Sequence, residues 1–139
     1  MDKYIPCLKL FAPVFFIVAG LHLFMGVNAE VSLGAKLSTS SLVDPVLDSQ
    51  NRFYGVIFSI YGVLLLLCAS DFQRYRPVFL CLLVVFFAGG IARLVSLSIV
   101  GIPSGLVLLL LASELLLPIL AYSTLRKVEN NPNHVDAEN

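Results

Sequence analysis

Four long apolar stretches alternate with short polar segments along this 139-residue chain. Each stretch is long enough to cross a hydrocarbon core of about 30 Å at 1.5 Å per residue. The pattern predicts four transmembrane helices. With their polar first turns, they cover residues 10–27, 45–69, 77–100 and 104–125.

Capping residues refine two of these helix starts. In "DPVLDSQN", Asp44 is suited to the N-cap and Pro45 to the first helical position, so the second helix begins outside the apolar stretch. Asp48 and Arg52 then lie four residues apart on one face and form an ion pair. In "RYRP", Pro77 marks the first turn of the third helix.

Composition supports a membrane protein. The chain is 58% hydrophobic and 13% charged, with a mean hydropathy of +0.91, whereas soluble domains are about 45–50% apolar and about 25% charged. The formal net charge is zero, so no basic field favours nucleic acid as a partner. No CxxC, HExxH, GxGxxG or P-loop motif occurs, so no metal or other cofactor is expected.

The basic residues predict the orientation. Lysines and arginines cluster before the first predicted helix, between the second and third, and after the fourth. The positive-inside rule places these three groups in the cytoplasm, together with both termini. The prediction is an all-α, antiparallel four-helix membrane bundle, with one domain at 1–125 and a polar, mobile tail at 126–139. A cleaved signal peptide is the alternative for the first helix, although its apolar run exceeds the usual 7–15 residues.

Two charges interrupt the third and fourth apolar stretches. Arg93 and Glu114 each lie about ten residues from the short turn "GIPSG", so an antiparallel hairpin brings them to the same depth. A lone arginine at the bilayer centre costs about 2.5–3.5 kcal/mol on insertion scales, and intramembrane charges usually pair. We therefore expect an Arg93–Glu114 ion pair. This ion pair either takes part in the function of the protein or is a purely structural clamp.

Pro118 lies four residues after Glu114 and removes the helical hydrogen bond to the Glu114 carbonyl. The freed carbonyl needs another donor inside the membrane. Arg93, with five donors, could serve both this carbonyl and the Glu114 carboxylate.

Further polar residues are expected at the same depth, in the outer half of the bundle. We predict a ligand-binding pocket there, lined by His22, Asn51, Arg52, Tyr54, Arg93 and Glu114, with Tyr61 as an alternative to Tyr54. His22 could instead be an interhelical hydrogen-bonding group, and Arg52 could simply anchor at the interface. Small residues on shared helix faces should let the helices pack closely; they are Gly55, Ser59, Gly62 and Gly89.

The motifs "SQNRFYG", "GGIARLVSL", "GIPS" and "ELLLP", in this order, resemble a family of small bacterial membrane proteins, the domain of unknown function 4345 family. The chain is also similar in size and layout to DoxX-like four-helix proteins. The resemblance implies a four-helix bundle, multi-pass, in the bacterial inner membrane, and implies no activity. The positions of this chain that match the family's motifs are Asn51, Arg52, Gly55, Arg93, Pro103, Glu114 and Pro118.

Three functions compete on this sequence. The first is a non-enzymatic bundle that binds a lipid-like or anionic lipophilic ligand, because two arginines face one glutamate in the expected pocket. The second is an accessory or assembly subunit of a larger membrane complex, with Arg93–Glu114 as a clamp. The third is an enzyme with Glu114 or His22 as general base, which we disfavour because no nucleophile is recognisable. Membrane lipids are expected partners in every case, and the oligomeric state stays open.

Overall fold

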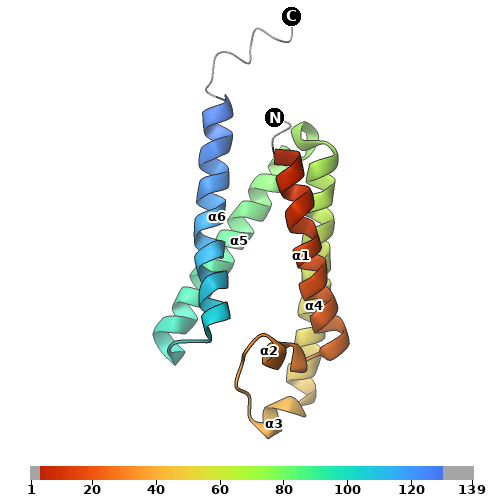
Figure 1. Ribbon diagram of the computed structural model, residues 1–139, viewed down its shortest axis with the longest axis vertical. Coiled ribbons are helices and arrows are strands. Elements are labelled where there is room, and N and C mark those ends of the chain that lie inside the picture. The colour runs from red at the N-terminus through yellow and green to blue at the C-terminus, as the bar shows by residue number, and fades with distance from the viewer. Residues whose placement is uncertain (1–3, 130–139) are drawn as a thin grey trace, which may run out of the picture. The chain divides into compact units, whose positions relative to one another are not determined.

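The computed structural model describes residues 4–129, which form six helices and no strand (Figure 1). Four of the helices are long and apolar enough to cross a membrane, and two short ones lie between the first two of these. The helices are α1 (Tyr4–Met25), α2 (Asn28–Ser32), α3 (Thr39–Leu42), α4 (Pro45–Ser70), α5 (Phe72–Val100) and α6 (Gly105–Glu129). The predicted all-α class is confirmed for this range, as is the presence of four helices that could span a membrane.

Helix contacts divide the chain into two compact units. The first reaches Phe79 and contains α1 to α4 with the first two turns of α5. The second begins at Leu80 and contains the rest of α5 and α6.

Helices α1 and α4 pack along their length in the first unit, and small residues line the contact (Figure 1). The pair is antiparallel, since Leu23 meets Gly55 while Phe16 meets Gly62. Buried alanine and glycine recur every seven residues on both helices, at Ala12 and Ala19 on α1 and at Gly55, Gly62 and Ala69 on α4. In lipid, helices gain little by burying apolar surface from water, so close packing through small residues holds such pairs together.

The α1–α4 contact is closest at Gly55. A β-carbon there would lie 2.9 Å from both the Ala19 carbonyl oxygen and the Leu23 amide nitrogen. One turn later, the Ser59 hydroxyl donates to the Gly55 carbonyl at 3.0 Å. A β-carbon at Gly62 would touch the Phe16 ring at 3.0 Å. The face that carries these three residues is therefore the packing face of α4 against α1.

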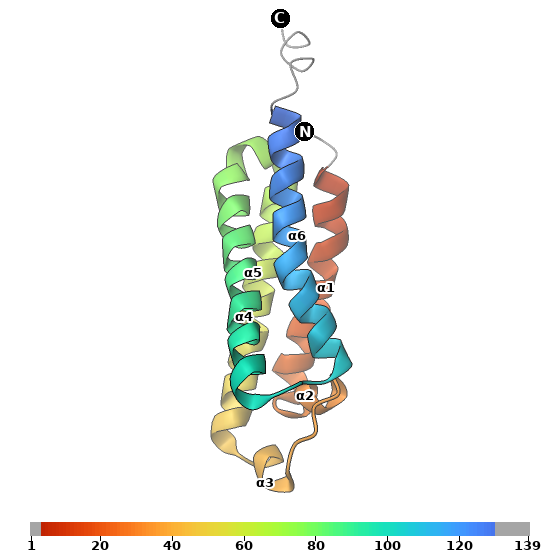
Figure 2. The ribbon, with the colours of Figure 1, turned by 90° about the vertical axis from the view of Figure 1, so that its left-hand side faces the viewer.

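The second unit is a hairpin of α5 and α6, joined by residues 101–104 (Figure 2). Gly101 ends α5 with a φ of +110°, which an L side chain rarely adopts. Pro103 lies in the turn, and the Ser104 carbonyl accepts the Leu108 amide at 3.1 Å as α6 begins. The hairpin packs closely at Gly90, where a β-carbon would lie 2.8 Å from the Leu115 side chain. The neighbouring Gly89, expected at such a contact, has open space around its α-carbon.

The start of α4 is as predicted. Asp44 is the N-cap, and its Oδ1 accepts the amides of Val46 at 2.8 Å and Leu47 at 3.2 Å. Pro45 occupies the first helical position, where the missing N–H would have had no helical partner.

The predicted start of the third long helix is wrong. Helix α5 begins at Phe72, not Pro77, because Asp71 Oδ1 accepts the Arg74 amide at 3.0 Å and caps an earlier turn. Pro77 is the sixth helical residue and removes only the hydrogen bond to the carbonyl four residues before it.

Other boundaries differ by a few residues. Helix α1 already begins at Tyr4. It ends at Met25, because Gly26 leaves the helix with a φ of +56°. Helix α6 continues to Glu129, beyond the predicted end at 125, through Arg126 and Lys127, whose charges suit a helix C-terminus. Of the predicted mobile tail, residues 130–139 lie outside the described part of the chain.

Candidate functional site

The ion pair predicted inside the α5–α6 hairpin is formed. Arg93 Nε donates to both carboxylate oxygens of Glu114, at 3.0 Å to Oε1 and 2.8 Å to Oε2. Glu114 is buried, with 8% of its surface exposed, whereas the Arg93 side chain is 37% exposed. The pair thus shields the acid and leaves part of the Arg93 side chain accessible.

The geometry of α5 brings these charges together. Gly90 lies one turn before Arg93, and a β-carbon there would come within 3.1 Å of the Glu114 Cβ. The absence of a side chain at Gly90 therefore lets α6 approach at the level of Glu114. The arginine can then reach the carboxylate from the next turn.

A hollow of about 220 Å³ adjoins the ion pair in the same hairpin. It extends from Arg93 to the turn at Gly101 and Pro103, and Val107 and Leu111 line it from α6. Ser96 is the other polar side chain in its lining. The hollow is therefore a mostly apolar space with a cationic group at the end away from the turn.

Arg93 retains hydrogen-bonding capacity beside this hollow. A guanidinium has five N–H donors, and both hydrogen bonds to Glu114 come from the single Nε–H. The four Nη N–H groups take no part in the hydrogen bonds of the pair. The sequence suggested that Arg93 also serves the Glu114 carbonyl freed by Pro118. Pro118 does lie inside α6, but the Arg93 hydrogen bonds found within residues 4–129 reach only the carboxylate.

A second polar cluster closes the end of α1 against α4. Asp48 Oδ1 accepts the Val27 amide at 3.2 Å, and its Oδ2 accepts from Arg52 Nε at 2.8 Å, as the predicted ion pair. Arg52 Nη1 also donates to the Leu23 carbonyl at 2.6 Å. Arg52 therefore satisfies a carbonyl left open where α1 ends, in addition to balancing Asp48.

The turn at Gly26 makes this closure possible. Its φ of +56° turns the chain back over α4, and a β-carbon at this position would overlap the Asp48 carboxylate. The Gly26 amide still donates to the His22 carbonyl at 3.0 Å. Glycine thus meets two needs here, the left-handed backbone and the room for Asp48.

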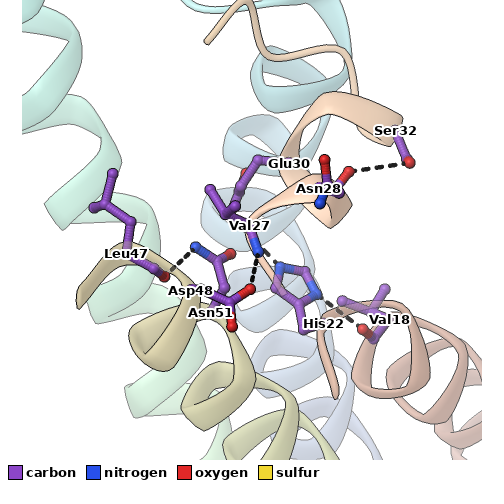
Figure 3. A network of polar contacts seen from close by, with 9 residues as sticks. All are labelled: Val18, His22, Val27, Asn28, Glu30, Ser32, Leu47, Asp48 and Asn51. Atoms are coloured by element: carbon purple, nitrogen blue, oxygen red, sulfur yellow. Dashed lines mark hydrogen bonds and ion pairs between the residues drawn. The ribbon is translucent and has the colours of Figure 1, made fainter. Parts of the chain in front are cut away.

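His22 joins α1 to α2 within this cluster (Figure 3). Its Nδ1 lies 2.9 Å from the Val18 carbonyl oxygen, which can only accept, so Nδ1 carries the proton. Its Nε2 lies 3.6 Å from Glu30 Oε1 on α2. His22 is 3% exposed, and the centroid of its ring lies 5.5 Å from that of Phe58. Sequence reasoning missed Glu30, because its approach depends on the turn at Gly26.

Asn51 is buried beside Asp48, with 6% exposure (Figure 3). Its Nδ2 donates to the Leu47 carbonyl at 3.0 Å, while its Oδ1 is buried and has no hydrogen-bond partner in the described chain. A water molecule could satisfy such an acceptor.

The predicted site residues therefore fall into two clusters. His22, Asn51 and Arg52 belong to the first unit, and Arg93 and Glu114 to the second. Tyr54 is 46% exposed on α4. Tyr61 stacks on Phe15, with ring centroids 4.7 Å apart.

Both arginines in the two clusters have an acidic partner. Asp48 pairs with Arg52 and Glu114 with Arg93. The net-positive pocket expected from two arginines and one glutamate is therefore not the arrangement within either unit. The charge of Arg93 is paired with Glu114, so what Arg93 can still provide to a ligand is its Nη hydrogen-bond donors.

Asp48→Asn tests the role of the cap. An amide cannot balance Arg52, so the hold on the Val27 amide should weaken, and amide hydrogen exchange in residues 26–33 should accelerate. Mass spectrometry of the exchanged protein in micelles measures this, and Asp44→Asn, which changes another acid in the same segment, serves as the control. Unchanged exchange in residues 26–33 would show that Asp48 does not hold the turn.

The fold and the clusters define a class: a small helical protein with four candidate membrane spans and a paired intramembrane charge. Residues 7–125 match the family described as domain of unknown function (DUF4345), so the chain belongs to that family. No curated protein sequence and no solved structure matches the chain. Among residues 4–129, no group of three or more His, Cys, Asp or Glu side chains could hold a metal ion.

Proposed function

We propose that the protein is a non-enzymatic, multi-pass protein of the bacterial inner membrane that binds a lipid-like amphiphile beside Arg93. In this proposal the α1–α4 pair and the α5–α6 hairpin assemble into an antiparallel four-helix bundle with both termini in the cytoplasm. The positive-inside rule supports this orientation, because Arg126 and Lys127 lie in the last turn of α6 and Lys3 and Lys9 lie at the start of the chain.

One observation carries the proposal. Arg93 lines a mostly apolar hollow while binding Glu114 through Nε alone. An amphiphile with an oxygen-acceptor head, such as a fatty-acid carboxylate, would place its head at the remaining guanidinium donors. Its tail would lie against Val107 and Leu111. Hydrogen bonds to charged groups contribute about 1.5–3 kcal/mol, enough to select this head over a donor head.

Binding fits the site better than catalysis does. Both carboxylate oxygens of Glu114 accept the Nε–H of Arg93, so the carboxylate is engaged by a partner within the protein. The acid is therefore suited to holding the arginine in position for a ligand.

Native mass spectrometry can test the proposal on protein extracted gently in its own lipids and then offered oleate or oleylamine. These probes share a tail and differ in the head. We expect oleate to be retained at least tenfold more tightly than oleylamine. Val107→Phe, which fills the hollow and spares the ion pair, should abolish the difference.

Val95→Phe is the matched control, because Val95 is exposed on α5 and does not line the hollow. It should bind oleate like the natural protein. Equal retention of the two probes, or oleate binding that survives Val107→Phe, would overturn the proposal. A stoichiometric second protein in place of any small ligand would also overturn it and would favour an accessory subunit.

A further inference from the structure

A second groove lies on the α5–α6 hairpin, farther from the turn than the hollow at Arg93. Its volume is about 370 Å³, and its lining is apolar almost throughout. Leu83 and Phe87 line it from α5, and Pro118 and Ile119 from α6. Phe87, the α5 residue of the groove nearest to Arg93, precedes it by six residues, about 9 Å along the helix, whereas the hollow extends from Arg93 toward the turn. The two spaces are therefore separate.

The groove ends in polar and then basic residues on α6. Tyr122 and Ser123 are its last lining residues. Arg126 follows Tyr122 by four residues, and Lys127 follows Ser123 by four, so both cations continue the same helix face. Both are exposed. From Ile119 to Arg126 the face thus changes from apolar, through a tyrosine, to cationic within about 10 Å.

This order matches that of a phospholipid. The acyl chain is apolar, the glycerol region lies at the level where membrane proteins place tyrosine, and the phosphate lies outermost. Lysine and arginine near an anionic membrane surface each contribute about fivefold in affinity. A neutral or cationic lipid would gain the apolar contact without this contribution.

We propose that the groove on α5 and α6 binds an anionic phospholipid, with one acyl chain between Leu83 and Ile119 and the phosphate at Arg126 and Lys127. The site is independent of the amphiphile site proposed at Arg93, because the two share no lining residue. It would tie the C-terminal end of α6 to a negatively charged leaflet.

The chain contains no tryptophan, so Tyr122→Trp places a single fluorescent reporter in the groove. The full chain with this change is reconstituted in phosphatidylcholine vesicles that contain either brominated phosphatidylglycerol or brominated phosphatidylcholine. Bromine quenches tryptophan on contact. We expect phosphatidylglycerol to reach half-maximal quenching at an at least fivefold lower mole fraction than phosphatidylcholine.

Arg126→Gln with Lys127→Gln, in the same background, should remove this preference and leave quenching equal for the two lipids. Lys9→Gln with Arg74→Gln removes two other exposed cations and should preserve it. Equal quenching before any charge is removed would overturn the proposal, as would a preference that survives the loss of Arg126 and Lys127. Circular dichroism and gel filtration confirm that each variant retains its fold.

Discussion

Arg93→Ala is expected to lower the free energy of unfolding by roughly 3–5 kcal/mol, measured by denaturant titration in mixed micelles. The loss comes mainly from Glu114, which is 8% exposed and accepts both of its hydrogen bonds to Arg93 from one Nε. Without Arg93, the carboxylate is either buried with its charge unpaired or must take up a proton.

Adding Glu114→Gln to Arg93→Ala should recover part of this loss, because the double variant carries no buried charge. Ser113→Ala controls for local disturbance of α6, since the Ser113 hydroxyl donates only to the Leu110 carbonyl of its own helix. If the single and double variants are both as stable as the natural protein, the ion pair makes no net contribution.

Gly55→Ala is expected to destabilise the first unit by about 1–3 kcal/mol, the usual cost of overpacking. The added carbon would lie 2.9 Å from two backbone atoms of α1, the Ala19 oxygen and the Leu23 nitrogen. Backbone atoms cannot rotate away as a side chain can, so the helices must separate. The separation should also lengthen the hydrogen bond from Arg52 to the Leu23 carbonyl.

Gly20→Ala is the matched control in the same helix pair. A β-carbon at Gly20 would meet no atom of another helix or side chain within 4 Å, so alanine there should be neutral or stabilise the helix by up to about 1 kcal/mol. The same titration compares the two variants. Equal stability of Gly55→Ala and Gly20→Ala would contradict the close approach of α1 and α4.

Local rules on the sequence were sufficient for several features. Asp44 and Pro45 determine the start of α4 through neighbouring residues alone, and Asp48 and Arg52 pair because they are four apart. The Arg93–Glu114 pair is a longer-range contact, but the short turn places both residues at equal depth. Each of these predictions needs only the geometry of one helix or one hairpin.

Other features depend on information that such rules lack. Pro77 was a plausible first-turn residue, and only the Asp71 cap, a weaker signal six residues earlier, indicates the true start of α5. Glu30 reaches His22 because the chain reverses at Gly26. Arg52 reaches the Leu23 carbonyl, 29 residues away, only once α1 and α4 are packed. Gly90 rather than Gly89 contacts α6, because the rotation of α5 about its own axis decides which of the two glycines faces that helix.

The pairing of Arg93 with a partner in the next helix has a consequence for biogenesis. During synthesis, α5 emerges with its arginine before the glutamate exists, and the partner follows 21 residues later. At about 5–20 residues per second, the arginine waits about 1–4 s. A helix carrying an unpaired arginine partitions poorly into lipid. If the insertion machinery retains α5 until α6 arrives and releases both helices as one hairpin, the arginine enters the lipid already paired.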